Sequence, residues 1–268
     1  DLPAGDYLFI ALANQKSYDE TLLTPGAKYK RSEMERGDAQ EKLCVTLDRT
    51  NGLVSNAAPL DTLWHGMTPS AVSVRANDYN VATISMVRDT KMLTIGLHNL
   101  DEGERTNISA EDFDITIRDK NGRLAYDNTV VEEETLTYTP FHKWDTQTVD
   151  AHGDVVDKTA HASLTFNRLM LHEDINDDAI LTIINKKDGK EVANINLAQF
   201  LQQGRNAIDT HRYGSQEYLD RGYDFYMDFF LKGGEWHEVE LSVGIGLHIL
   251  SWARRIQRVD IFEAMHRI

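Results

Sequence analysis

The sequence has little cysteine: Cys44 is the only one among 268 residues. A single thiol cannot form an intramolecular disulfide, and it cannot supply a cysteine-based zinc or iron-sulfur site. Cys44 lies in the alternating run at residues 43–47, where we expect it to be a small packed residue of a strand. Disulfide-dependent folding is therefore excluded, whereas a secreted location is not.

Basic residues are also scarce, since 28 Lys and Arg stand against 43 Asp and Glu and give a formal net charge of −15. Such a chain repels phosphate backbones, whose binding requires clustered cations. Nucleic acid is therefore not expected as a partner. Solubility explains the acidity, which says nothing about the fold.

Long apolar runs are missing as well, and none approaches the roughly 18 residues that suggest a membrane-spanning helix. The chain opens on Asp1-Leu2-Pro3 with neither an initiator Met nor a signal peptide, so we expect any targeting segment to lie outside it. Hydrophobic residues make up 41% and charged residues 26%, which is an ordinary globular composition with room for two cores.

Helical periodicity is confined to residues 197–203, which are followed by Gly204 where a C-terminal cap would fall. Elsewhere apolar and polar residues alternate, which is the pattern of a strand with one buried face. The alternating segments are residues 7–12, 43–47, 81–87, 93–97, 113–118, 162–166, 180–184, 223–231, 239–243 and 247–252. Many short strands separated by turns indicate an all-β chain built from sandwiches.

Turn sequences predict how some of these strands join. Asn121-Gly122 predicts a tight hairpin between the strand at residues 113–118 and a returning strand that begins at Leu124. The Lys-Asp-Gly-Lys sequence at residues 187–190 predicts a second hairpin. The Arg-Asp-Thr sequence at residues 88–90 predicts a turn after the strand at 81–87.

Alternation fades between residues 130 and 158, most clearly in the polar stretch at 145–157. Linkers between domains are polar and poor in periodic apolar residues. We therefore expect an N-terminal β-sandwich at residues 1–150 and a C-terminal one at residues 151–268.

No residue pattern asks for an enzyme. The chain has no Gly-x-Ser-x-Gly sequence, and Cys44 has no nearby His or basic residue arranged to lower its pKa. Carboxylates are so numerous that any chosen pair is uninformative. We predict no catalytic residue and no cofactor.

Metal sites are also not predicted. Four histidines lie in and just beyond the polar stretch: His142, His152, His161 and His172. Their spacing matches no pattern that places two ligands on one helix or turn, so solvated loop histidines are preferred. Asp174, Asn176 and Asp178 begin like a calcium loop, but Ala179 stands where that loop needs Gly, so an acidic turn is preferred.

Trp64 and Trp144 are predicted to lie in loops, where exposed aromatic rings suit a carbohydrate or partner contact. Packing onto a neighbouring strand is nevertheless the preferred role for both.

Several blocks of sequence resemble one protein family. They are Leu164-Thr165-Phe166-Asn167-Arg168-Leu169-Met170, Ile195-Asn196-Leu197 with Phe200-Leu201, and Gln216-Glu217-Tyr218-Leu219-Asp220-Arg221 followed by Tyr223, Met227 and Phe229-Phe230-Leu231. Upstream blocks are Asp1-Leu2-Pro3-Ala4-Gly5-Asp6-Tyr7, Asn121-Gly122 and Tyr126-Asp127-Asn128. They resemble the FimB-type fimbrial anchor and accessory subunits of Bacteroidales, the fimbrillin-associated anchor lipoproteins. The block at residues 216–221 is fairly specific, since no structural rule demands Gln-Glu-Tyr-Leu-Asp-Arg before a strand.

The resemblance implies two tandem Greek-key, transthyretin-like β-sandwiches with one short helix in the second. The family normally begins with further strands before the Leu-Pro-Ala-Gly turn and, in the precursor, with a lipid-modified cysteine. Both are missing here, so we expect the N-terminal sandwich to lack its first strands. Gly222 also departs from the family, which often has an acidic residue at that position.

For function, the resemblance implies a non-enzymatic fimbrial subunit, as anchor, accessory or tip component, located at the cell surface in the outer membrane or fimbria. Its expected partners are other fimbrial subunits, met by β-strand addition, and the outer membrane, reached through a lipid anchor outside this chain. Candidate partner-strand contacts are Trp252, Ile256, Val259 and Ile261.

Two other function classes stay open. The first is a surface adhesin or glycan-binding protein that uses Trp64 and Trp144 to meet a host-surface protein or glycan. The second is a hydrolase on a β-sandwich scaffold, which requires a cleft with convergent carboxylates or histidines of shifted pKa.

Overall fold

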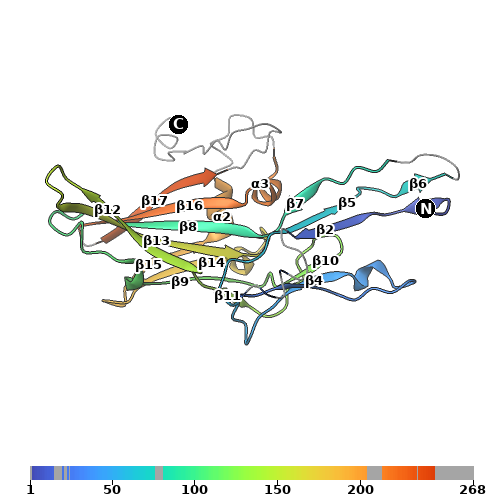
Figure 1. Ribbon diagram of the computed structural model, residues 1–268, viewed down its shortest axis with the longest axis horizontal. Helices are drawn as coiled ribbons and strands as arrows, with labels where there is room; N and C mark the ends of the chain where they lie inside the picture. Colours follow the sequence, from blue (N-terminus) through green and yellow to red (C-terminus); the bar gives the residue numbers. More distant parts are fainter. Residues whose placement is uncertain are drawn as a thin grey trace.

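Strands dominate the computed structural model, which describes residues 2–14, 20, 23, 25–75, 81–203, 213–233 and 235–244 (Figure 1). This confirms the all-β class. No helix within these ranges is long and apolar enough to cross a membrane.

The larger part of the fold is a sandwich of two sheets. Its strands are β8 (Lys91–Asn99), β9 (Phe113–Asp119), β11 (Leu136–Tyr138), β12 (His142–Val149), β13 (Val155–Phe166), β14 (Ile180–Asn185), β15 (Glu191–Asn196), β16 (Asp224–Lys232) and β17 (Glu235–Gly244). One sheet has the order β12-β13-β8-β16-β17 and the other β11-β9-β14-β15. All neighbours in them are antiparallel except β16 and β8, which are parallel.

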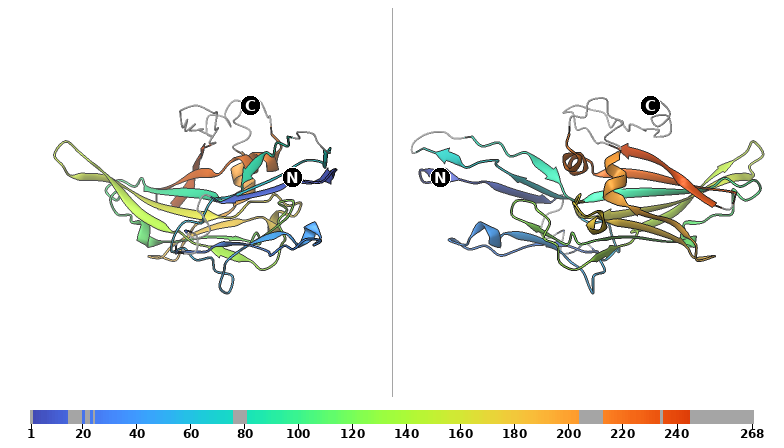
Figure 2. Two further views of the ribbon diagram at one scale, coloured as in Figure 1. Left: turned by 45° about the vertical axis from the view of Figure 1, so that its right-hand side comes forward. Right: turned by 180° about the vertical axis from the view of Figure 1, so that it is seen from behind.

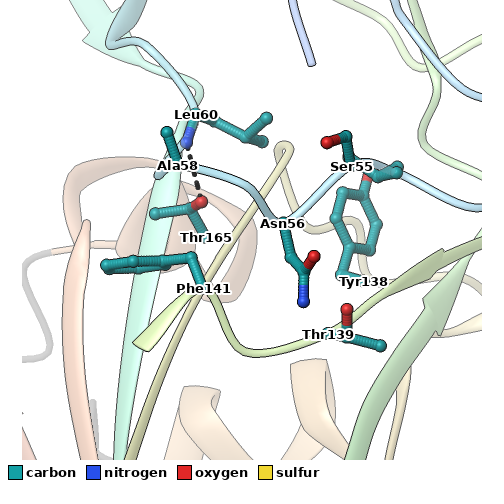
Figure 3. Close-up of a pocket in the computed structure, with 9 residues that line it drawn as sticks. Ser55, Asn56, Ala58, Leu60, Tyr138, Thr139, Phe141 and Thr165 are labelled. Atoms are coloured by element: carbon teal, nitrogen blue, oxygen red, sulfur yellow. Dashed lines mark hydrogen bonds between the residues drawn. The ribbon is translucent and has the colours of Figure 1, made fainter. Parts of the chain in front are cut away.

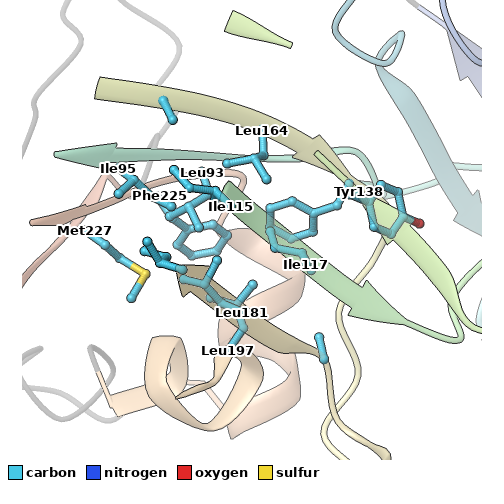
Figure 4. Packing of buried hydrophobic residues seen from close by; sticks show 14 of the residues in the cluster. Leu93, Ile95, Ile115, Ile117, Tyr138, Leu164, Leu181, Leu197, Phe225 and Met227 are labelled. Carbon is cyan, nitrogen blue, oxygen red and sulfur yellow. The ribbon is translucent and has the colours of Figure 1, made fainter. Parts of the chain in front are cut away.

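The core of this sandwich follows directly from the alternation in the sequence. Residues Leu93, Ile95 and Leu97 of β8 are 0% exposed, and Phe225 and Met227 of β16 lie beside them (Figure 4). Each such side chain contributes roughly 1.5–3 kcal/mol by leaving water. The opposite face of the same strands is turned away from this core.

Short helices cover one end of the sandwich. They are α2 (Leu197–Gln202) and α3 (Ser215–Arg221), and single 3-10 turns occur at η1 (Gln40–Lys42), η2 (Ala110–Asp112) and η3 (Ile175–Asp177). Helix α2 confirms the predicted helix: the Asn196 side chain accepts a hydrogen bond from the Gln199 amide, a cap worth about 1 kcal/mol. Helix α3 was not predicted.

A smaller group of strands extends from one end of the sandwich (Figure 2). They are β1 (Gly5–Tyr7), β2 (Ile10–Asn14), β3 (Tyr29–Arg31), β4 (Cys44–Leu47), β5 (Leu63–Met67), β6 (Val72–Val74), β7 (Met86–Arg88) and β10 (Arg123–Ala125). They form sheets in the orders β2-β5-β7, β10-β4-β3 and β1-β6. Their own buried cluster consists of Val45, Leu63 and Leu124.

Two strand predictions are corrected in this smaller group. The segment 7–12 is divided between β1 and β2, because β1 pairs with β6 whereas β2 pairs with β5. Within residues 81–87, strand structure is limited to Met86 and Val87, and Arg88 of the expected turn completes β7.

The hairpin predicted at Asn121-Gly122 is wrong. Strand β9 pairs with β11 and β14, whereas β10 crosses to pair with β4. The Asn121 side chain is buried and donates to the carbonyls of Asn167 and Arg168, so this turn is held within the fold and passes the chain from one group of strands to the other. The hairpin at residues 187–190 is confirmed by the pairing of β14 with β15.

The polar stretch at 145–157 is the β12–β13 hairpin, whose strands pair directly. The expected domain boundary at residue 150 falls in its turn, so a division there would cut both large sheets, each of which contains strands from either side. The division into domains stays a prediction, and the pairing favours a boundary near Asp89, with β10 returning to the N-terminal strands.

Candidate functional site

The blocks of sequence with the family resemblance converge where the N-terminal strands meet the sandwich. Arg168 follows β13 and forms a two-pronged ion pair with Asp220 of α3, with both N–O distances 2.7 Å. The two side chains are only 12% and 14% exposed. Gln216, one turn earlier in α3, donates to Asp220 and to the Leu169 carbonyl and accepts from the Leu171 amide. These contacts bind α3 to the end of β13.

Lys91, at the start of β8, lies in the same junction and is 1% exposed. Its Nζ donates to the carbonyls of Arg88, Asp220 and Gly222 at 2.8–2.9 Å. Burial lowers the pKa of Lys91 to about 7. The three carbonyls oppose this lowering of the pKa. They favour the charged form of Lys91, because only an ammonium group has three N–H bonds to donate. Lys91 therefore ties the β7–β8 connection to α3.

Neighbouring polar groups extend this buried network toward the N-terminal strands. Asn128 has a left-handed φ of 68° and donates to Asp89, whose pKa is raised by burial. Arg168 also donates to the Asn128 carbonyl. Tyr138 donates to Asn121 at 2.6 Å in the core. These contacts hold the two strand groups together, although Asp89 Oδ2 and Asn128 Oδ1 are buried without a hydrogen-bond partner.

The outward face of the five-stranded sheet presents a second cluster. Trp144 of β12 lies between two imidazoles, with ring-centroid distances of 4.7 Å to His142 and 5.0 Å to His161. The His161 ring also bonds the Thr146 hydroxyl at 2.8 Å. Burial, followed by the charge of His98, lowers the pKa of His161. The Trp144 ring is thus already engaged in stacking contacts within the protein.

This cluster continues onto the central strands of the sheet. His98 of β8 stacks on Phe230 at 4.8 Å and bonds Asp228 of β16 at 3.0 Å. Gly96 makes the arrangement possible, because a Cβ there would lie 2.1 Å from the Asp228 carboxylate. The side chains form a connected surface rather than a cleft.

Small hollows also occur among the described residues, and two of them bear on the function. One has a volume of about 10 Å³, enough for a single water molecule, beside the bond from the Leu60 amide to Thr165 (Figure 3). The other, about 290 Å³, is open and polar, and its edge carries the Lys120–Asp177 ion pair. Asp177 belongs to η3, so the segment at 174–178 is a turn, as expected.

The structure places the predicted site residues as follows. Trp64 lies in β5 and Trp144 in β12, so the prediction that they occupy loops is wrong. His142 and His161 also lie in strands, whereas His152 lies in the hairpin turn. In the described ranges, no three His, Cys, Asp or Glu side chains gather so as to hold a metal. Cys44 is a free thiol in β4, partly rather than fully buried.

None of the four predicted partner-strand contacts falls within the described residues. They are Trp252, Ile256, Val259 and Ile261. Their proposed role as partner-strand contacts stays a prediction.

Open edges are the remaining feature of the N-terminal strands. Of the edge strands in the sheets β2-β5-β7 and β10-β4-β3, β10 is hydrogen-bonded to residues 129–131, whereas β2, β7 and β3 pair with no further strand in the described part of the chain. Val45, Leu63 and Leu124 form a small buried cluster in these sheets, and Leu47 of β4 belongs to the larger core. Such sheets offer ladder hydrogen-bonding groups to an additional strand.

Solved structures with the same fold come from species of Bacteroides and Porphyromonas. A candidate adhesin from Bacteroides thetaiotaomicron is 26% identical, with a TM-score of 0.73 over 90% of this chain and 76% of that one. A candidate polysaccharide-binding protein from the same organism is 25% identical, with a TM-score of 0.69 over 91% and 75%. The fimbrial anchor protein Mfa2 of Porphyromonas gingivalis, 17% identical with a TM-score of 0.50 over 84% and 69%, shares the fold.

The fold and these likenesses define a cell-surface protein of the fimbrial and adhesin-like class. The family model for fimbrillin-A associated anchor proteins Mfa1 and Mfa2 matches residues 1–256. The chain belongs to that family. No curated protein matches it significantly.

Proposed function

We propose that this protein is a non-enzymatic fimbrial subunit, acting as anchor, accessory or tip component, that joins other subunits by β-strand pairing. The observation that carries this proposal is the pair of three-stranded N-terminal sheets, in which the edges of β2, β7 and β3 are open and the separate buried cluster consists of Val45, Leu63 and Leu124. An added strand would supply both missing ladder bonds and apolar cover. Family membership supports the fimbrial setting.

Outer-membrane attachment through a lipid outside residues 1–268 belongs to the same proposal. It rests on the family resemblance. The largely buried ion pair of Arg168 and Asp220 suits such a role, because a subunit under tension must transmit force between its two groups of strands.

The glycan-binding alternative finds less support. It relies on Trp64 and Trp144, yet both lie in strands, and two imidazoles already stack on Trp144. Sugar rings bind to open aromatic faces, so this arrangement does not favour a glycan or host-protein contact at Trp144.

Photo-crosslinking in fimbriated cells that produce the protein tests the proposal. A photoreactive residue at Ala13, exposed on edge strand β2, should yield an adduct with another fimbrial subunit. The matched position is Ile184, 38% exposed on the internal strand β14, and should yield little adduct. Equal adducts at both positions, or none with a protein that still co-purifies with fimbriae, would contradict strand pairing at this edge.

A further inference from the structure

The β12–β13 hairpin projects beyond the end of the sandwich (Figures 1 and 2). Strand β13 pairs with β8 from Phe166 back to Thr159. Farther out, residues 155–158 pair with β12 alone among the described strands. The Lys158 amide still donates to the Arg105 carbonyl, but beyond that bond the extension is a two-stranded ribbon in the described part of the chain, and such a ribbon is marginally stable in water.

Three exposed valines gather at the hairpin tip. Val149 is 51% exposed, Val155 37% and Val156 43%, and Val149 pairs directly with Val155. Single exposed apolar residues are common, but a cluster at the end of a projecting element marks a contact with another molecule.

The free edge of β12 is covered near the sandwich and open near the tip. At the covered end, Asp145 accepts from the Ala110 amide and from the Ser109 hydroxyl, and Lys143 donates to the Phe113 carbonyl. No such contact reaches the edge at residues 146–149 in the described part of the chain. With eight residues, β12 is longer than the edge strands β3, β7, β10 and β11, which have three each, and β15, which has six, although β17 at the other edge of the same sheet has ten. Folded proteins usually keep edge strands short.

The charge around the valines is negative. Asp150, Asp154 and Asp157 surround the tip, and Lys158 is the nearest cation in sequence. Asp150 is engaged in the turn itself, accepting from the amides of His152 and Asp154. An occupant with both apolar and basic side chains would match this surface.

We infer that the hairpin is a docking strand, onto which a neighbouring fimbrial subunit adds an extended segment of alternating apolar residues with Lys or Arg, alongside residues 146–149. This inference rests on the proposed function, and it assigns a contact separate from the N-terminal edges. The segment would complete the ladder at the open edge and cover Val149 and Val156.

The test uses the full chain in the fimbriated cells that produce it, with a photoreactive residue at Thr148. The wild type should give an adduct in which the linked peptide, mapped by mass spectrometry, is an extended segment of a fimbrial subunit. A Val149→Lys, Val156→Lys double variant should reduce this adduct at least tenfold, because lysine on an edge opposes strand addition and its ammonium must be desolvated. The matched control is Val81→Lys, at a valine that is 72% exposed and distant in sequence from the hairpin.

The outcomes distinguish a failure of the docking strand from a failure of the proposed function. If the protein co-purifies with fimbriae but the double variant gives as much adduct as the control, the docking strand is overturned and the proposed function stands. An adduct with a second copy of this chain also overturns it. If the wild type neither co-purifies with fimbriae nor forms an adduct, both are overturned. A Val149→Ser, Val156→Ser variant, checked for the wild-type unfolding midpoint, guards against misfolding and should also lose adduct.

Discussion

Arg168 and Asp220 face each other across 52 positions of sequence and form two parallel N–H···O bonds of 2.7 Å. One residue ends a sandwich strand and the other lies in α3. Because Arg168 also donates to the Asn128 carbonyl, a single guanidinium joins three segments. Two of the family-like blocks quoted from the sequence therefore meet in one ion pair.

Replacement of Arg168 by Met should lower the free energy of unfolding by about 3–5 kcal/mol, the usual cost of removing one partner from a buried pair. The Asp220 carboxylate would then stay buried without its counter-charge. Urea unfolding followed by tryptophan fluorescence measures the loss. The control is Glu217→Gln, which breaks the exposed Glu217–Arg221 pair on the same helix and should cost no more than about 1 kcal/mol. Equal losses would contradict the assigned role of Arg168.

Lys91→Met should destabilise the protein by at least about 2 kcal/mol, since each buried carbonyl left unpaired costs roughly 1–3 kcal/mol. Three carbonyls lose their donor in this variant. Lys91→Arg keeps the charge, but a planar guanidinium cannot point at three converging carbonyls as an ammonium does, so it should rescue little. Full stability in Lys91→Arg would show that charge alone matters at this position.

The sequence predicted strand positions better than strand partners. Alternation located β8, β9 and β16, because their inward residues form a continuous core. Pairing failed at Asn121-Gly122, where a local turn signal competed with buried side-chain bonds to Tyr138 and to the chain after β13. The residues next to Asn121 in the sequence do not indicate which distant groups its side chain will bond.

The polar hairpin and the polar junction were missed for related reasons. Residues 145–157 resemble a linker because an exposed two-stranded ribbon buries little and so needs few apolar residues. The junction draws Lys91, Asn128, Arg168 and Asp220 from four separate segments, so no spacing reveals it. The family-like blocks were the one available signal of this junction, since they contain polar residues that the strand pattern does not require.

Acid should weaken the protein partly through His161, whose pKa is lowered by burial and by the charge of His98. Because the folded-state pKa lies below the unfolded value of about 6.5, the unfolded chain gains a proton more readily as pH falls. Stability is therefore lost below about pH 6.5. His161→Gln should show a smaller difference between urea midpoints at pH 7.5 and pH 5 than the wild type. His152→Gln, in the exposed hairpin turn, should leave the wild-type difference unchanged.

Two buried glycines allow a matched test of close packing. A Cβ on Gly66 would lie 2.7 Å from the backbone carbonyl oxygen of Ser85 and 2.7 Å from Ile84, so β5 and β7 would have to separate. Gly66→Ala should therefore cost about 1–3 kcal/mol, as overpacking usually does.

At Gly96 the clashing atom is the end of the Asp228 side chain, which can rotate away. Gly96→Ala should cost less than about 1 kcal/mol, partly offset because Gly is the weaker strand residue. The substitution should nevertheless separate Asp228 from His98. A change in the imidazole signals of His98 in NMR spectra would report this separation. If Gly96→Ala proves the more damaging variant, the Asp228 carboxylate is held more firmly than its contact with His98 accounts for.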